Sequence, residues 1–347
     1  MTTVRLPLRP VLRGGESIIE REITEPVDLC LPSGRLNPDA VGWTRSALHR
    51  TNLRGWGRNK RFEYWAVTTP TAIITLNISH HDYRANVSVS YWDRESTTEI
   101  RQGGNTWLPG HAGMRDPKNS LPMQARRRDV VVRLTPRGRG THLHAESARI
   151  SVDLTVHAEP DHESMGVLVP WSDRLFQYTK KDNDLTAEGI VTVDGVAHRV
   201  EHRSSAAVHD RGRGRWPYRT FWNWGSGRGE DERGRTLGLQ FGGKWTDATP
   251  STENWLRIDG RLHKVSDHLD WQYDPADWLA PWTITGPRVK MRFTPERHVR
   301  HKFNRWIILS RGDTCYGSYA GEVTLDDGSV VRFSDIAGHV EEVERRW

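Results

Sequence analysis

The chain contains little cysteine, the residue that forms disulfides in small proteins and binds zinc in many metal sites. Its 347 residues include two cysteines, Cys30 and Cys315, which lie far apart and form no CxxC pair. A disulfide framework needs several cysteines, and a cysteine-bound zinc needs closely spaced pairs, so both are excluded. The histidine pairs at positions 80–81 and 142–144 have no third ligand at a recognisable spacing. We therefore expect neither a metal nor a cofactor.

Long apolar runs are also missing. No stretch of about 18 consecutive apolar residues occurs, so we expect no membrane span. The first residues, Met1 to Pro7, lack the continuous apolar segment of a secretory signal peptide. These two features together favour a cytoplasmic location for the protein.

Charge of one sign is not concentrated along the chain. The net charge is +6, and the arginines are spread from Arg5 to Arg346. Binding to nucleic acid needs a basic stripe on one face of the protein, which this distribution does not provide. We expect a small-molecule ligand and no nucleic-acid partner, and the pattern indicates no particular oligomeric state.

Helical periodicity is scarce, whereas alternation with a period of two is common. Residues 150–156 alternate apolar and polar side chains, as a strand with one wet face does. Asp-Gly pairs begin at Asp194, Asp259 and Asp327, and each favours a tight turn between antiparallel strands. The pattern predicts a chain built mainly from hairpins.

The predicted fold is therefore all-β, with antiparallel barrels or sandwiches and little helix. Residues 37–41 and 274–279 begin as short helices do, each with a proline near its start. The irregular N-terminal residues are expected to wrap the first sheet. We predict two β domains, residues 1–200 and residues 201–347.

Tryptophan, by contrast, is abundant, with 16 residues. Several of them follow His209 and Asp210 within residues 208–225. A histidine beside a carboxylate can transfer protons when burial brings both pKa values closer to neutral. The alternative is that Asp210 caps a turn or pairs with an arginine, while His209 is a half-buried ring.

The aromatic run after these two residues predicts a wall for a ligand. It contains Trp216, Tyr218, Trp222 and Trp224, with Asn223 between two of the indoles. In a strand, Trp222 and Trp224 share one face, and Asn223 lies on the other as a candidate ligand donor. The alternative is that the indoles fill the core of the protein.

A second polar constellation follows two glycines at positions 242 and 243. It contains Lys244, Trp245, Asp247, Glu253 and Asn254. The spacing of a phosphate-binding loop is absent, which excludes nucleotide binding. We take Glu253 as the best candidate for a second catalytic acid and the others as ligand contacts. The alternative for Glu253 is a solvated charge in a hairpin loop.

The segment before the predicted strand at residues 62–65 is a third candidate. It carries Arg54 and Trp56 among several basic residues. These side chains could bring cationic groups to a cleft. The alternative is a basic turn on the surface.

Residues 52–57, 209–225 and 243–254 resemble a bacterial family known as domain of unknown function 2804, from about Glu22 to near the C-terminus. The His209-Asp210 pair and the aromatics after Gly214 are more distantly similar to the carotenoid 1,2-hydratases and related lipocalin-like proteins. This second resemblance implies two lipocalin-like barrel domains with the His-Asp motif where they meet. It also implies addition of water to an isoprenoid double bond, without a metal, by acid residues of the pocket.

Three functions are consistent with these patterns. The first is a cofactor-independent, hydratase-like lyase or isomerase acting on a small, partly apolar molecule in a tryptophan-lined cavity near the domain junction. In that enzyme His209 and Asp210 transfer protons, and Glu253 is the second acid. The second is a glycoside-acting enzyme whose carboxylate pair is Asp210 and Glu253. The third is a non-catalytic protein that binds a hydrophobic or anionic metabolite, with Arg54, Arg211 and Arg213 clamping an acid group of the ligand.

Overall fold

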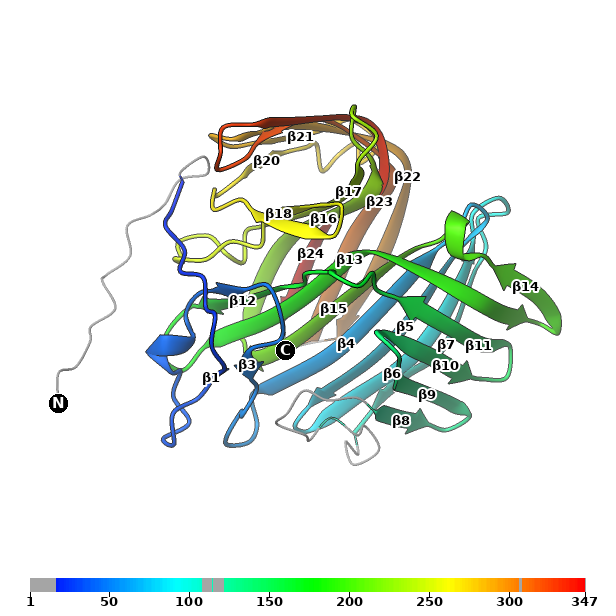
Figure 1. Cartoon of the computed structure of the whole chain (residues 1–347). Helices are drawn as coiled ribbons and strands as arrows, with labels where there is room; N and C mark the ends of the chain where they lie inside the picture. The colour runs from blue at the N-terminus through cyan, green and yellow to red at the C-terminus, as the bar shows by residue number, and fades with distance from the viewer. Residues whose placement is uncertain (1–16, 108–113, 115–121, 306–307, 347) are drawn as a thin grey trace.

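A computed structural model of the chain describes residues 17–107, 114, 122–305 and 308–346 (Figure 1). These residues form two large antiparallel sheets, with short 3-10 helices at Pro38–Ala40 (η1) and His202–Ser204 (η3). One sheet is a nearly closed barrel and the other a half-barrel. The prediction of an all-β protein with two barrel-like domains and little helix is confirmed.

The first sheet contains 13 strands in the order β7-β6-β5-β4-β15-β13-β11-β10-β9-β8, with β12 and β14 paired to β13, and β2 paired to β12. Its strands are β2 (Trp43–Thr44), β4 (Asn59–Thr68), β5 (Ala72–His81), β6 (Arg84–Asp93), β7 (Glu99–Thr106), β8 (Met123–Arg127), β9 (Val130–Arg137), β10 (Gly140–Glu146), β11 (Ile150–His157), β12 (Met165–Pro170), β13 (Phe176–Val193), β14 (Val196–Val200) and β15 (Ala206–Arg215). The end strands β7 and β8 lie close to each other: Arg127 Nε of β8 donates to the carbonyl of Asn105 in β7 at 2.8 Å. This contact nearly closes the barrel.

The core of the barrel follows from the alternation in its strands. In β11 the side chains of Ile150, Val152, Leu154 and Val156 are buried, and those between them face outward. The same pattern in β4, β5, β6, β9 and β10 fills the interior with aliphatic side chains. The outer face of the barrel is consequently polar, and part of it is available to contact the second sheet.

The long strand β13 belongs to two parts of the barrel at once. A register shift between Asp182 and Leu185 divides it, and Asp184 adopts a left-handed φ of 60° there. The first half pairs with β12 and β15, and the second half pairs with β11 and β14. The bulge therefore marks a corner of the barrel close to the second sheet.

The second sheet contains nine strands in the order β19-β18-β17-β16-β24-β23-β22-β21-β20. Its strands are β16 (Arg219–Glu230), β17 (Thr236–Gly243), β18 (Trp255–Ile258), β19 (Arg261–Lys264), β20 (Asp270–Gln272), β21 (Trp282–Thr285), β22 (Val289–Arg305), β23 (Ile308–Thr324) and β24 (Val330–Arg346). Its concave face holds a separate core that includes Phe241, Trp282, Phe293, Tyr319 and Val340. A small parallel pair, β1 (Val27–Asp28) and β3 (His49–Arg50), lies in the N-terminal segment.

All three Asp-Gly pairs lie in hairpin turns, as predicted. Asp194-Gly195 joins β13 to β14 and Asp259-Gly260 joins β18 to β19, with positive φ at both residues of each pair. Asp327-Gly328 lies in the longer loop between β23 and β24. Residues 38–40 form a helical turn as expected, but residues 274–279 form non-helical turns, with a bridge between Asp274 and Asp277.

The two sheets meet through their outer faces. In Figure 1 the second sheet curves above and behind β13, β15 and β4. Contacts across the junction include Tyr64 with Trp224, at 6.4 Å between ring centres, and Arg228 with Asp184 at 2.6 Å. The first sheet ends with β15 at Arg215 and the second begins with β16 at Arg219. The division into domains 1–200 and 201–347 stays a prediction about folding units.

Candidate functional site

Strand β15 places His209 and Asp210 on opposite faces of the first sheet. Successive side chains of a strand point to opposite sides, and these two find different partners. The ring of His209 lies inside the barrel, stacked on Trp65 with centres 4.1 Å apart. Asp210 faces the second sheet and accepts from Thr179 Oγ1 and Lys181 Nζ, both at 3.1 Å. The structure does not bring the predicted acid–base pair together.

His209 belongs to a buried ionic network around Glu63. The Glu63 carboxylate lies 2.7 Å from His209 Nε2, 2.7 Å from Arg211 Nε and 2.5 Å from Arg213 Nη2. Burial alone would raise the pKa of Glu63, but the two guanidiniums hold it well below its ordinary value. Arg211 and Arg213 are thus engaged by Glu63, and Arg54 is exposed. The structure does not assemble the predicted arginine clamp.

The same network reaches the second sheet through Asp182. Its carboxylate lies 3.1 Å from His162 Nε2, 3.7 Å from His209 Nδ1 and 3.7 Å from Arg257 of β18. Lys180, His162 and His209 lower the pKa of Asp182 well below its ordinary value, against the effect of burial. The inner cluster is charge-compensated, which suits a structural role.

The outer face of β13 and β15 centres on Lys181, which sequence reasoning missed. Its ammonium lies 3.1 Å from Asp210 Oδ2, 3.8 Å from Glu253 Oε1 and 4.2 Å from the ring centre of Trp224. Burial would lower the pKa of Lys181, but the carboxylates of Asp210 and Glu253 raise it above its ordinary value. A charged ammonium therefore joins two predicted acids that come from different sheets.

Glu253 is the most perturbed acid of this cluster. It is 2 % exposed, and Trp245 Nε1 donates to its Oε2 at 3.0 Å. Its Oε1 has no hydrogen-bond partner among the residues that the structure describes. Burial raises the pKa of Glu253 to about 7, with Lys181 opposing and Asp210 adding to the rise. Glu253 can therefore hold a proton at neutral pH and present it on Oε1.

The local chain explains how this carboxyl group comes to lie against the sheet. Gly242 of β17 lies beneath it, and a Cβ on that glycine would meet Glu253 Oε2 at 2.7 Å. The neighbouring Asn254 accepts from the Gly242 amide at 2.8 Å and donates to the Asp267 carbonyl at 2.7 Å. Asn254, predicted as a ligand contact, thus has both ends of its amide bound to backbone and positions the loop.

A third carboxyl group, on Glu341 of β24, borders the cluster. Trp222 Nε1 donates to Glu341 Oε1 at 2.8 Å. Burial raises the pKa of Glu341, and Asp210 adds to the effect. His339, two residues before it, meets the Trp224 ring edge-on at 4.7 Å, and burial followed by the Lys181 charge lowers its pKa to about 4. The imidazole is therefore neutral at physiological pH.

The remaining predicted ligand contacts lie outside this cluster or at its border. Trp216 packs edge-on against Trp222 at 5.9 Å. Trp56 and Tyr218 are 76 % and 45 % exposed, so they stand on the surface. Lys244 and Asp247 are exposed in the loop after β17. Of the predicted residues, the structure gathers Asp210, Trp222, Trp224, Trp245 and Glu253.

Asn223 lies on the opposite face of β16 from its two tryptophan neighbours, as the alternation predicts. It is fully buried, and its Nδ2 lies 3.2 Å from the Glu341 carbonyl and 3.4 Å from the Tyr273 hydroxyl. Lys244 reaches the same side, with Nζ 2.6 Å from Glu342 Oε2. Asn223 and Lys244 therefore contact the inner side of the half-barrel rather than the layer between the sheets.

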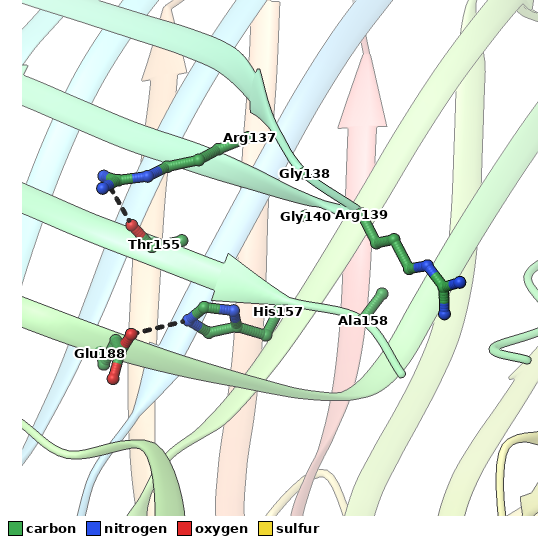
Figure 2. A pocket seen from close by; sticks show the side chains of 8 residues that line it. All are labelled: Arg137, Gly138, Arg139, Gly140, Thr155, His157, Ala158 and Glu188. Carbon is green, nitrogen blue, oxygen red and sulfur yellow. Dashed lines mark hydrogen bonds and ion pairs between the residues drawn. The ribbon is translucent and has the colours of Figure 1, made fainter. Parts of the chain in front are cut away.

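A pocket of about 330 Å³ lies elsewhere, on the outer face of the barrel. Figure 2 shows Arg137 reaching Thr155 and His157 reaching Glu188 beside it, at 3.2 and 3.1 Å. A neighbouring pocket of about 720 Å³ shares Arg137, Thr155 and Glu188. Neither contains a residue predicted from the sequence as catalytic or substrate-binding.

The described residues include no group of three or more histidine, cysteine, aspartate or glutamate side chains arranged to hold a metal ion. His142 and His144 lie near each other on β10, with ring centres 6.3 Å apart. They bind Asp153 and Glu146 at 3.1 and 3.0 Å. In the same part of the chain, no helix has the length and apolar character needed to cross a membrane.

The two barrel-like sheets define a class of all-β proteins with two barrel-like domains. Kievitone hydratase from Nectria haematococca has a similar fold, with a TM-score of 0.51 and 10% identity, over 84% of this chain and 89% of that one. A protein of Nitrosomonas europaea provisionally named AttH gives a TM-score of 0.49 and 12% identity, over 83% and 92% of the two chains. At 10% identity the likeness to kievitone hydratase is one of fold.

The chain itself belongs to the family described as domain of unknown function DUF2804, which it matches over residues 20–347. The family resemblance predicted from the sequence is confirmed. No curated protein matches the chain.

Proposed function

We propose that the protein is a cofactor-independent, hydratase-like lyase or isomerase whose reactive centre is the cluster of Asp210, Lys181 and Glu253. The observation that carries the proposal is Glu253 itself, a buried carboxyl group with a pKa of about 7 whose Oε1 accepts no hydrogen bond from the residues that the structure describes. General acids work best when their pKa lies near the operating pH. Perturbed acids of this kind are concentrated at functional sites.

The roles follow from the contacts of each group. Glu253 Oε1 gives its proton to one carbon of a double bond, and positive charge develops on the other carbon. The Asp210 carboxylate and the indole face of Trp224 stabilise that charge. Water then attacks this carbon and passes its proton to Asp210. Lys181 Nζ, 3.1 Å from Asp210 and 3.8 Å from Glu253, relays the proton back to Glu253. One water molecule is consumed, and the enzyme is restored.

The geometry favours this function over the two other hypotheses. A glycoside-cleaving pair flanks the bond that it breaks, whereas one ammonium lies close to both Asp210 and Glu253. A non-catalytic binder of acids would need a clamp, but Arg211 and Arg213 both bind Glu63. The hydratase-like fold neighbour is consistent with the proposal and is no part of its support.

The test uses the small molecules that purify with the protein. These molecules are identified by mass spectrometry and incubated with the enzyme in deuterated buffer. We expect the wild-type protein to add or remove one water molecule, or to place deuterium on carbon. Glu253→Gln and Asp210→Asn should each slow this reaction by about 10² to 10⁴, the usual contribution of an acid–base group. Glu188→Gln, a matched change on the barrel surface, should not slow it. A Glu253→Gln enzyme with the full rate contradicts the proposal.

A further inference from the structure

A row of buried donors lies next to the proposed centre. Ser226, Gln240 and Trp255 occupy directly paired positions on β16, β17 and β18, so their side chains share one face of the second sheet. They are 2 %, 0 % and 0 % exposed. Among the described residues, no partner exists for Ser226 Oγ, Gln240 Nε2 or Trp255 Nε1. Buried polar atoms in native proteins almost always have a partner, so three adjacent exceptions need an explanation.

The side chains of this row offer hydrogen-bond donors that have no acceptors. The indole of Trp224 donates to Gln240 Oε1 at 2.8 Å, which orients the amide and leaves the two N–H groups of Nε2 unused. The indole nitrogen of Trp255 can only donate, and the hydroxyl of Ser226 can rotate to donate. Arg257 of β18 lies on the same face, and its Nε is also without a partner in the described chain. Oxygen atoms of a ligand would satisfy this row.

The charges around the row disfavour an acidic ligand. Lys181 is bound to Asp210, and Arg345 donates to the carbonyls of Arg311 and Glu344 at 3.1 and 3.4 Å. Glu253 and Glu341 add two further carboxyl groups to the same layer, while His339 is neutral. Arg257 donates to the carbonyls of Asn183 and Glu163 and lies 3.7 Å from the Asp182 carboxylate, so within the described part of this layer only its Nε is left over. A ligand carboxylate would therefore be desolvated without gaining a partner.

We infer that the ligand is an uncharged molecule with hydroxyl, carbonyl or ether oxygens at one end, bound by Ser226, Gln240 and Trp255. Its unsaturated part then lies against Trp224, towards Glu253. Gln240 is two residues from Gly242, beneath Glu253, so the oxygens and the reacting carbon are separated by about 7 Å, the length of two strand residues. The placement of the reacting carbon rests on the proposed function, whereas the preference for a neutral, oxygen-bearing ligand does not.

Three probes of one size separate charge from hydrogen bonding. They are naphthalenemethanol, which is neutral and carries a hydroxyl, methylnaphthalene, which has no acceptor, and naphthoate, which is anionic. Equilibrium dialysis measures the binding of each probe to the full-length protein. We expect naphthalenemethanol to bind roughly tenfold more tightly than methylnaphthalene, as one recovered hydrogen bond allows. Naphthoate should bind more weakly still.

Two variants connect the preference to the row. Gln240→Met removes the amide donors and should abolish the advantage of naphthalenemethanol over methylnaphthalene. Gln272→Met, a matched change at an exposed site on β20, should keep it. Ser226→Ala protects the test against misfolding, because removing an orphaned hydroxyl should leave the melting temperature unchanged or raise it. The alcohol should still bind more weakly to Ser226→Ala than to the wild-type protein.

The outcomes separate this inference from the proposed function. Equal binding of the three probes, tight binding of naphthoate, or an alcohol advantage that persists in both row variants overturns the inference. A lowered melting temperature in Ser226→Ala also counts against it, because the hydroxyl would then be bonded in the protein. If the neutral preference holds while Glu253→Gln keeps the full reaction rate, the inference stands and the proposed function fails.

Discussion

At the scale of single residues, Glu253 makes the stability of the protein depend on pH. Its pKa is about 7 in the folded protein and 4.5 in the unfolded chain, so between these values the folded state holds a proton that the unfolded state has lost. Folding stability due to Glu253 is therefore complete below about pH 4.5 and decreases as the pH rises towards 7. Above about pH 7 the buried carboxyl group is ionised in the folded state as well, and its full destabilising effect on folding is present.

A comparison of Glu253→Gln with the wild type measures this cost. The amide keeps an acceptor for Trp245 and never ionises. We expect the variant to melt at a higher temperature than the wild type at pH 8, and the difference to shrink towards pH 5. Thermal unfolding across this range is the measurement, with Glu188→Gln as the exposed control. A difference that grows towards low pH would contradict the raised pKa of Glu253.

Gly242 provides a second prediction at this scale. An alanine there would place its Cβ 2.7 Å from Glu253 Oε2, which displaces the carboxyl group. We expect Gly242→Ala to fold, because the nearest obstructing atom is the end of a side chain and Glu253 Cβ, at 3.0 Å, needs to move by only a few tenths of an ångström, but to lose at least tenfold in kcat/KM. The control is Gly312→Ala, whose Cβ would meet Val343 Cγ2 at an ordinary 3.6 Å. Equal activity of the two variants would show that Glu253 is not part of the reactive centre.

The sequence identified Asp210 and Glu253 because each stands in an unusual local run of residues. It missed Lys181, Glu341 and His339, which lie in strands that look ordinary. Their importance comes from register: Lys181 is paired with Asp210, and Glu341 is paired with Trp224. Pairing between strands far apart along the chain cannot be read from one sequence, so only the acids with a local signal were found.

At the scale of the element, two consecutive residues of β15 have different roles. His209 belongs to the buried ionic network, and Asp210 belongs to the proposed reactive centre. The inner side chains of β15 build the ionic network around Glu63, and its outer side chains face the second sheet. The sequence predicted β strands and hairpin turns here, but it interpreted His209-Asp210 as a local pair. Alternation along a strand contradicts that pairing. The error came from treating adjacency in sequence as proximity of side chains, which holds in turns and fails in strands.

The two residues should therefore respond differently to substitution. His209→Phe keeps a ring on Trp65 but removes the hydrogen bond to Glu63 Oε2. We expect a loss of about 1–3 kcal/mol in the free energy of unfolding, the cost of an unsatisfied buried group. The kcat/KM of the folded enzyme should stay near the wild-type value.

Denaturant unfolding and steady-state kinetics on the same preparation measure both effects. His157→Phe is the control, because that ring is partly exposed and its bond to Glu188, at 3.1 Å, lies on the surface of the barrel. A folded His209→Phe protein with no turnover would show that His209 takes part in catalysis.

At the scale of the whole molecule, the proposed centre exists only where the sheets dock. Asp210 and Lys181 come from the barrel, whereas Glu253 and Trp224 come from the half-barrel. The sequence predicted two β domains with a site near their junction, but not which faces meet. Those faces are chosen by contacts such as Asn183 with the second sheet, which have no local signature. The function should therefore be more sensitive to docking than either sheet is.

Asn183 provides the test of this coupling. It is 1 % exposed, donates to the Leu239 carbonyl at 2.7 Å and lies 3.2 Å from Arg257 Nη1. In Asn183→Ala the Leu239 carbonyl on β17 and the Arg257 guanidinium on β18 stay buried but lose this hydrogen-bond partner. We expect the free energy of unfolding to fall by about 1–3 kcal/mol. Because the lost contacts join the sheets, we expect a loss of at least tenfold in kcat/KM while the far-ultraviolet circular dichroism of the strands is unchanged.

The control for this prediction is Gln124→Ala, a change of similar chemistry on the exposed outer strand β8, where the side chain contacts Arg133 at 3.1 Å. It should alter neither activity nor stability. If Asn183→Ala destabilises the protein as expected but the surviving folded molecules keep wild-type kcat/KM, then docking does not set the geometry of Lys181 and Glu253. The reactive centre would in that case have to lie within one sheet, because a centre shared by both cannot be indifferent to the contact that joins them.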